Sequence, residues 1–150
     1  MDKSIPDKWV RKAIFDAINN MDVVNPYTSQ TIQIPCYIER VTANGGSNHY
    51  ILLTTQTNQT NKLTKCEDSW NSSILVDVIT SFDSSGNPSG KQLADDILDK
   101  ARDLTKNLTL DVASGLTILR QTQNFPNDIA TITDTENVFR KLMRIEMFIN

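Results

Sequence analysis

Four aspartates in one short stretch have the spacing best suited to chemistry. Asp95, Asp99 and Asp103 recur every four residues, and Asp96 follows the first of them directly. On a helix this spacing aligns three carboxylates as an acidic ridge, and a pair of them could hold a metal ion. Basic residues are interleaved along the same surface, as on any solvated helix: Lys91, Lys100, Arg102 and Lys106. We therefore interpret the ridge first as a solvated face and second as a metal site.

The other reactive side chains are few and scattered. His49 is the single histidine and follows a Gly-Gly turn, so we expect a solvated turn residue, and a histidine metal cluster is excluded. Cys36 is expected to be a buried small hydrophobe, and Cys66 lies in a polar stretch without a partner. The glycines match neither a dinucleotide-binding nor a P-loop spacing. We predict no catalytic set and no cofactor.

The element that carries the aspartates is the clearest in the chain. Between Ser73 and Asp83 the residues Ile74, Val76 and Val78 alternate, which predicts a strand with one buried face. A polar break from Asp83 to Pro88 follows. Beyond it the apolar residues recur at spacings of three and four, which predicts an amphipathic helix: Leu93, Ala94, Ile97, Leu98, Ala101 and Leu104.

The flanking segments predict the rest of the fold. A helix is expected from about Pro6 to Asn19-Asn20, with an apolar stripe at Val10, Ile14, Ala17, Ile18 and Met21. Ile34–Val41 and Tyr50–Thr57 are expected to pair as a hairpin through Asn44-Gly45-Gly46-Ser47. Gly115–Arg120 is expected to be a short strand. The C-terminal segment fits a strand or a helix, with a slight preference for the strand, and its basic patch of Arg140, Lys141 and Arg144 suggests an interface or ion pairs.

Two long stretches lack any apolar period. Thr57–Ser69 either extends the hairpin into solvent or forms a flexible loop, and Gln121–Asn137 is a second polar connection to which Ile129 and Ile132 could add an edge. Segments of this kind often contact other molecules, and ordering by a partner is expected of both. The residues proposed for partner contact are Asn58, Lys62, Lys65, Asn124, Asn127 and Asp128.

Composition sets the outer limits. The 150 residues suit one domain, residues 1–150, and the net charge of −3 with a pI near 5.0 gives no electrostatic argument for binding nucleic acid or a membrane. The apolar runs fall short of the roughly 20 residues that span a bilayer, and no signal-peptide core is present. We predict one α+β domain with a mainly antiparallel sheet and both helices on one face.

Four passages resemble the tail terminator, or tail-completion, proteins of tailed bacteriophages. RKAIFDAIN is similar to their opening helix, and SILVDVITSFDSSGNPSGKQLADDILDKA to their central strand, turn and helix. LTLDVASGLTILRQTQ resembles the segment after that helix, and DTENVFRKLMRIEMFI the terminal strand, which decides the C-terminal segment in favour of a strand. The two polar stretches, Thr57–Ser69 and Gln121–Asn137, do not match the family.

The resemblance implies a structural protein of the virion without catalytic activity. It would form a homo-oligomeric ring at the head–tail junction after assembly in the host cytoplasm, a hexamer being favoured over a dodecamer. DNA would pass through the ring without sequence-specific binding, with Asp95, Asp99 and Asp103 facing either the channel or the outer solvent. Its partners would be other neck, tail or portal-associated proteins. The alternatives are a twelve-copy connector of a short-tailed phage, a small metal-dependent enzyme using the acidic ridge, and a host-cell adaptor domain.

Overall fold

The computed structural model describes residues 5–39, 49–64, 67–83, 90–126, 128–132 and 136–150. In chain order its elements are α1 Asp7–Ile18, β1 Met21–Val24, β2 Thr31–Ile34, β3 Cys36–Ile38, β4 His49–Thr64, β5 Glu67–Asp83, α2 Gly90–Leu104, the 3₁₀ turn η1 Val112–Ser114, β6 Ile118–Asn124, β7 Ile129–Ile132 and β8 Glu136–Ile149. The predicted α+β class is confirmed.

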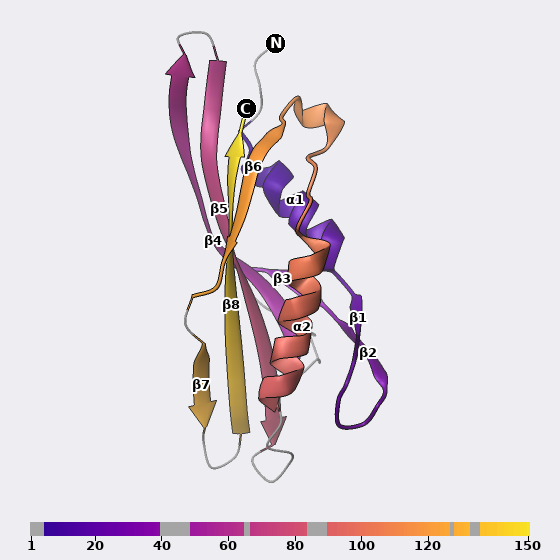
Figure 1. Cartoon of the computed structure of the whole chain (residues 1–150). Coiled ribbons are helices and arrows are strands. Elements are labelled where there is room, and N and C mark those ends of the chain that lie inside the picture. Colours follow the sequence, from indigo (N-terminus) through magenta and orange to yellow (C-terminus); the bar gives the residue numbers. More distant parts are fainter. Residues whose placement is uncertain (1–4, 40–48, 65–66, 84–89, 127, 133–135) are drawn as a thin grey trace.

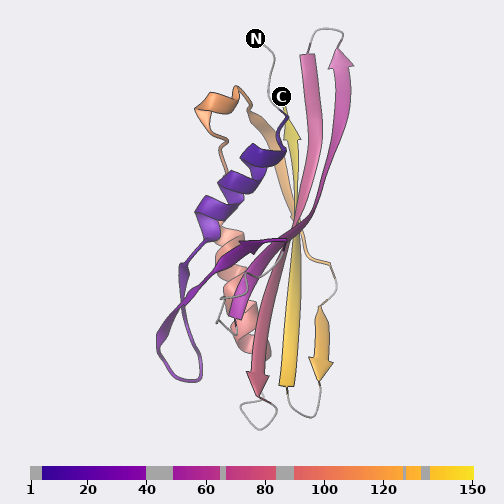
Figure 2. The ribbon, with the colours of Figure 1, turned by 180° about the vertical axis from the view of Figure 1, so that it is seen from behind.

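A six-stranded sheet dominates the molecule (Figure 1). Its strand order is β3-β4-β5-β8-β6, and β7 extends the β6 side by pairing with the other half of β8. All pairings are antiparallel except β3 with β4. Figures 1 and 2 show α1 and α2 on the same side of this sheet. The predicted arrangement of both helices over one face is therefore correct.

The hydrophobic core lies between that face and the helices. Strand β5 contributes Ile74, Val76 and Val78, and α1 contributes Val10, Ile14 and Ile18, all buried as their spacing predicted. The predicted stripe of α2 is buried too, except Leu104, which remains 42% exposed at the end of the helix. Strand β8 adds Met143, Ile145, Met147 and Ile149. The alternation of these four side chains explains why the C-terminal segment is a strand.

The predicted hairpin between Ile34–Val41 and Tyr50–Thr57 is wrong. The first segment divides at Pro35 into β2 and β3, and β3 runs parallel to β4, with Cys36 opposite Ile51. Pro35 has no N–H to donate to a strand ladder, although its carbonyl accepts from Ile51 N at 2.9 Å. The predicted turn at 44–47 and Val41 lie outside the described residues.

A small second hairpin was not predicted. Met21 belongs to β1 instead of the opening helix, and β1 pairs antiparallel with β2, placing Met21 opposite Ile34. The turn between the two strands is closed by Asn25, whose side chain accepts from Tyr27 N at 3.0 Å. Met21, Val23 and Ile34 are buried. This hairpin therefore adds to the core beside the helices.

Both polar stretches contain regular strands. Residues 57–64 and 67–69 lie at the far end of the β4–β5 pairing, which is not the hairpin that the segment was predicted to extend. Residues 121–124 belong to β6, and Ile129 and Ile132 bound the edge strand β7. Gln123 donates from Nε2 to Arg102 O at 3.1 Å and to Thr105 Oγ1 at 3.0 Å. These glutamine bonds satisfy polar atoms at the C-terminal end of α2.

Truncating Val78 to Ala should lower the free energy of unfolding by about 2 kcal/mol, through lost burial and a residual cavity. Val78 is fully buried in the middle of the face that the helices cover. Urea unfolding of the purified variant measures the loss. An unchanged midpoint would mean that this face of β5 is not the packed one.

Candidate assembly interface

The face of the sheet opposite the helices is the strongest candidate for a functional surface. Strand register places the side chains of Tyr50, Ile79 and Arg140 in one row across it, and those of Tyr37, Leu52, Asp77 and Leu142 in the next. Both helices lie on the other side (Figures 1 and 2). We call this surface the open face. Its two halves differ in chemistry.

The half near β3 and β7 is apolar and aromatic. The rings of Tyr37 and Tyr50 pack edge to face with their centroids 5.9 Å apart. Leu52, opposite Tyr37, and Leu142, opposite Asp77, are half-buried. Ile79 is 8% exposed, although α1 and α2 lie on the other face. Aromatic and aliphatic side chains of this kind dominate the centres of protein interfaces. This half is therefore suited to contact with another protein.

An ion pair with a buried carboxylate lies at the centre of the apolar half. Asp77 is 1% exposed and Arg140 of β8 donates to both of its carboxylate oxygens, from Nε to Oδ1 at 3.4 Å and from Nη2 to Oδ2. The hydrogen bond to Asp77 is the main cause of the raised pKa of Arg140. Two bonds from one guanidinium fix the geometry of the carboxylate as well as neutralising it. The pair holds the two central strands in register on this face.

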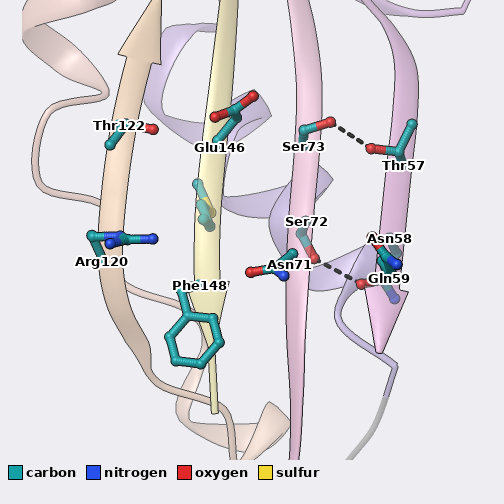
Figure 3. A pocket seen from close by; sticks show the side chains of 11 residues that line it. Thr57, Asn58, Gln59, Asn71, Ser72, Ser73, Arg120, Thr122, Glu146 and Phe148 are labelled. Atoms are coloured by element: carbon teal, nitrogen blue, oxygen red, sulfur yellow. Dashed lines mark hydrogen bonds between the residues drawn. The ribbon is translucent and has the colours of Figure 1, made fainter. Parts of the chain in front are cut away.

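The other half of the open face is polar and hollowed. A depression of about 350 Å³ crosses β4, β5, β8 and β6 (Figure 3). Arg120 and Glu146 project into it, and Thr57 Oγ1 and Ser73 Oγ lie 2.5 Å apart across two strands. Its lining offers hydroxyl and amide groups for hydrogen bonding, together with the opposite charges of Arg120 and Glu146.

Among the solved structures that resemble this chain is the "Virion of native gene transfer agent (GTA) particle". One of its chains matches with a TM-score of 0.58 and 12% identity over 94% of this chain and 96% of that chain. The fold therefore occurs in a virion. No protein-family model matches the sequence, and no curated protein matches it either. At this identity the likeness concerns the fold alone.

The predicted contact residues are distributed unevenly over the structure. Asn58 lines the depression and accepts from Ser72 Oγ at 3.0 Å, and Asn124 ends β6 opposite Arg144. Asp128 binds Lys141 of this same chain, with 3.1 Å between the charged atoms. Lys65 and Asn127 lie outside the described residues, and for Lys62 only the strand position is described. The structure brings Asn58 alone of this set into the depression.

The acidic ridge is not uniform. Asp95 forms an ion pair with Lys141, Asp103 binds Lys106 at 3.2 Å, and Asp99 is exposed. Lys106 and Arg102 together lower the pKa of Asp103. Burial, followed by repulsion from Asp99 and Asp95, raises the pKa of Asp96. Asp95, Asp99 and Asp103 all keep exposed side-chain surface, so the ridge stays a prediction for a solvent- or channel-facing surface.

The remaining reactive residues differ partly from expectation. His49 is not a solvated turn residue, because it begins β4 half-buried with its ring centroid 4.8 Å from that of Phe82. Cys36 is buried as predicted, and burial raises the pKa of its thiol to about 12. Cys66 lies outside the described residues. Among the described residues no three His, Cys, Asp or Glu side chains are grouped to hold a metal, and none of the helices there could span a membrane.

Several important residues of the open face escaped sequence reasoning. The alternation of β5 puts Asp77 on the face opposite Val76 and Val78 but does not indicate its partner, and Arg140 was expected only to belong to a basic patch. The sequence feature that could have revealed the pair is the single carboxylate of Asp77 among β-branched residues. A carboxylate that is buried on an interior strand of a sheet needs a cation as its partner. Tyr37 and Tyr50 were missed because the parallel pairing that brings them together was not predicted.

Replacing Lys141 by Met should cost about 2 kcal/mol of unfolding free energy near pH 7, because two charged hydrogen bonds are lost. Burial lowers the pKa of Lys141, but Asp95 and Asp128 outweigh this and raise it overall. Because folding raises the pKa of Lys141, its ion pairs stabilise the fold fully at pH values below the ordinary pKa of 10.5. This stabilisation is lost as the pH rises through the pKa of Lys141 in the folded protein. The difference between the two proteins should therefore shrink in alkali.

Urea unfolding at neutral and alkaline pH measures this difference. Lys12→Met is the matched control, since Lys12 pairs with Asp16 at an exposed site on α1 and its loss should change little. A Lys141→Met difference that stayed constant into strong alkali would contradict the assignment.

Proposed function

We propose that this chain is a structural, non-catalytic virion protein that forms a ring around the DNA channel at the head–tail junction. The observation that carries the proposal is the open face, an apolar and aromatic surface joined to a polar depression, on a fold that also occurs in a virion. An uncovered sheet face of this composition is typical of a subunit that completes its packing against neighbours.

The resemblance to tail terminators supports the finer assignment. Its four passages coincide with α1, with β5 and α2, with the segment that enters β6, and with β8. These elements build the core and both faces of the sheet. A homo-oligomeric ring with a hexamer favoured, and twelve copies in a short-tailed particle, follows from this resemblance, as do neck, tail or portal-associated proteins as partners and assembly in the host cytoplasm.

Complementation of defective particles tests the proposal. Particles made without this chain should accumulate heads and tails that are not stably joined, and purified wild-type protein should restore joining. A variant with Tyr50→Lys and Leu52→Lys should fold but restore joining poorly, because charge is placed on the apolar half of the open face. A Lys8→Glu variant, altered on α1, is the control. Full joining without this chain would overturn the proposal.

Asp99 and Asp103, the two most exposed members of the proposed channel-facing ridge, allow its position to be tested. Changing both to Lys, while leaving the Asp95–Lys141 pair intact, should still allow rings to form. If the ridge faces the channel, DNA release should slow because lysines bind phosphates, and the slowing should weaken at higher salt as the charges are screened. The matched control is Asp99→Asn with Asp103→Asn. Normal release by the lysine variant at low salt would place the ridge outside the channel.

A further inference from the structure

Strand β4 presents a long open edge. β3 pairs with it only opposite Ile51, Leu52 and Leu53. Beyond Leu53, within the described residues, β4 forms ladder hydrogen bonds with β5 alone. The following residues, TTQTNQTN at 54–61, include no charge and no proline. Helix α1 reaches this edge at Gln56, whose side chain accepts from Arg11 Nη1 at 2.9 Å and donates to Asp7 O at 2.8 Å, and a register shift follows Thr54. Residues 57–61 carry neither the charge nor the proline by which proteins often protect an exposed edge, which suggests that a strand covers this part in the assembly.

Strand β6 presents a second edge at the opposite side of the sheet. In the described part of the chain its ladder partner is β8 only. Leu119, the extra residue at a bulge, is 55% exposed beside this edge. A shallow groove of about 300 Å³ follows the edge between β6 and residues 106–109. An apolar residue and a groove at an unpaired edge again suggest a neighbouring segment.

The two edges are complementary in strand direction and in their position along the strands. Because β4, β5, β8 and β6 alternate in direction, β6 runs antiparallel to β4. The register places Gln59 and Arg120 in one row across the sheet, and Thr57 and Thr122 in the next. If a second copy lies beside the first with its strands in the same direction, its β6 runs antiparallel to β4 of the first copy. The residues that share a row within one copy, such as Gln59 and Arg120, then lie opposite each other across the two copies. Antiparallel strands form regular ladders without further connection.

We infer that the β4 edge of one copy pairs with the β6 edge of the next, so that the sheets of successive copies form one continuous sheet. This inference rests on the proposed ring function and specifies its subunit contact. The contact joins two different surfaces of the subunit, in a head-to-tail manner. Repeated contacts of this kind form a closed ring when the rotation from one copy to the next divides a full turn evenly. The polar depression, which spans β4 to β6, would then continue from copy to copy on the open face.

Disulfide trapping tests the contact. Gln59→Cys is combined in turn with Arg120→Cys, Thr122→Cys and Asn124→Cys, all in a Cys66→Ser background. These positions are exposed, so cysteine should be tolerated. Two strands separate β4 from β6, which places the paired cysteines about 14 Å apart within one copy. A disulfide needs Cα atoms about 4.4–6.8 Å apart, so any bond must join two copies.

At least one of the three pairs should give a ladder of covalent multimers that ends at the copy number of the ring. Gln59→Cys alone and Gln59→Cys with Lys12→Cys on α1 are the controls and should give no ladder. Circular dichroism and the mass of the assembly under reducing conditions establish that each variant folds and associates.

The outcomes separate this inference from the proposed function. Rings or particles that contain the protein but give no ladder with any pair would overturn edge pairing and leave the ring proposal standing. A ladder from a protein that is absent from particles would overturn the virion assignment and leave edge pairing standing. Monomers that never cross-link, even at high concentration, would overturn both.

Discussion

Replacing Arg140 by Met should lower the free energy of unfolding by about 3–5 kcal/mol, the usual cost of leaving one partner of a buried pair uncompensated. Asp77 is 1% exposed, whereas the Arg140 side chain is 40% exposed. Removing Arg140 therefore leaves the buried carboxylate of Asp77 without a counter-charge. Urea unfolding with a fluorescence or circular dichroism signal measures the loss.

The double variant Asp77→Leu with Arg140→Met is the matched control. It removes both charges and retains apolar volume, so its stability should return close to that of the wild type. Arg144→Met, on the same face of β8, should change stability much less. A single Arg140→Met variant as stable as the wild type would show that the ion pair does not support this face.

Truncating Ile97 to Ala should cost about 3 kcal/mol, because a fully buried side chain is lost where α2 packs on the sheet. The effect should exceed that of Val78→Ala, since more methyl and methylene groups are removed. Denaturant unfolding measures both. Asp99→Ala, on the exposed side of the same helix, is the control and should stay within about 0.5 kcal/mol of the wild type.

Equal losses from Ile97→Ala and Asp99→Ala would contradict the assignment of the buried stripe. A loss much smaller than that of Val78→Ala would mean that α2 can move to close the cavity. Either result would contradict tight packing of the apolar stripe of α2 against the sheet.

The strand–turn–helix from Ser73 to Leu104 could be predicted because its evidence is local. The apolar period changes from two to between three and four within one segment, and each period selects one element. The same reasoning predicted α1, whereas for the C-terminal segment it fitted both a strand and a helix. The packing of both helices on one face of the sheet could then be predicted, because two apolar helix stripes and one apolar strand face are buried together only in that arrangement.

Strand direction and long-range pairing could not be predicted in this way. The Gly-Gly sequence at 45–46 favours a hairpin, but β3 runs parallel to β4, because a residue pattern contains no information on which way a neighbouring strand runs. The Asp77–Arg140 pair joins residues far apart in sequence. Polar residues from 54 to 61 and 121 to 124 form strands because neighbouring strands supply their hydrogen bonds, which outweighs their low apolar content.

The acidic ridge illustrates the limit for the candidate site. Its helical spacing was correctly recognised, yet Asp95 is bound to Lys141, which sits on the helix-covered side of β8. A pattern along one helix contains no information on which residues another element supplies. The open face was missed for the same reason, since its residues come from five strands.

Counting the copies of this chain in purified particles tests the central claim most directly. Quantitative mass spectrometry against a major virion protein gives the number per particle, and gold-labelled antibodies give its location by electron microscopy. The ring proposal predicts six copies, or twelve in a short-tailed particle, with the label at the head–tail junction. Absence from purified particles, or a label spread along the tail or over the head, would contradict it.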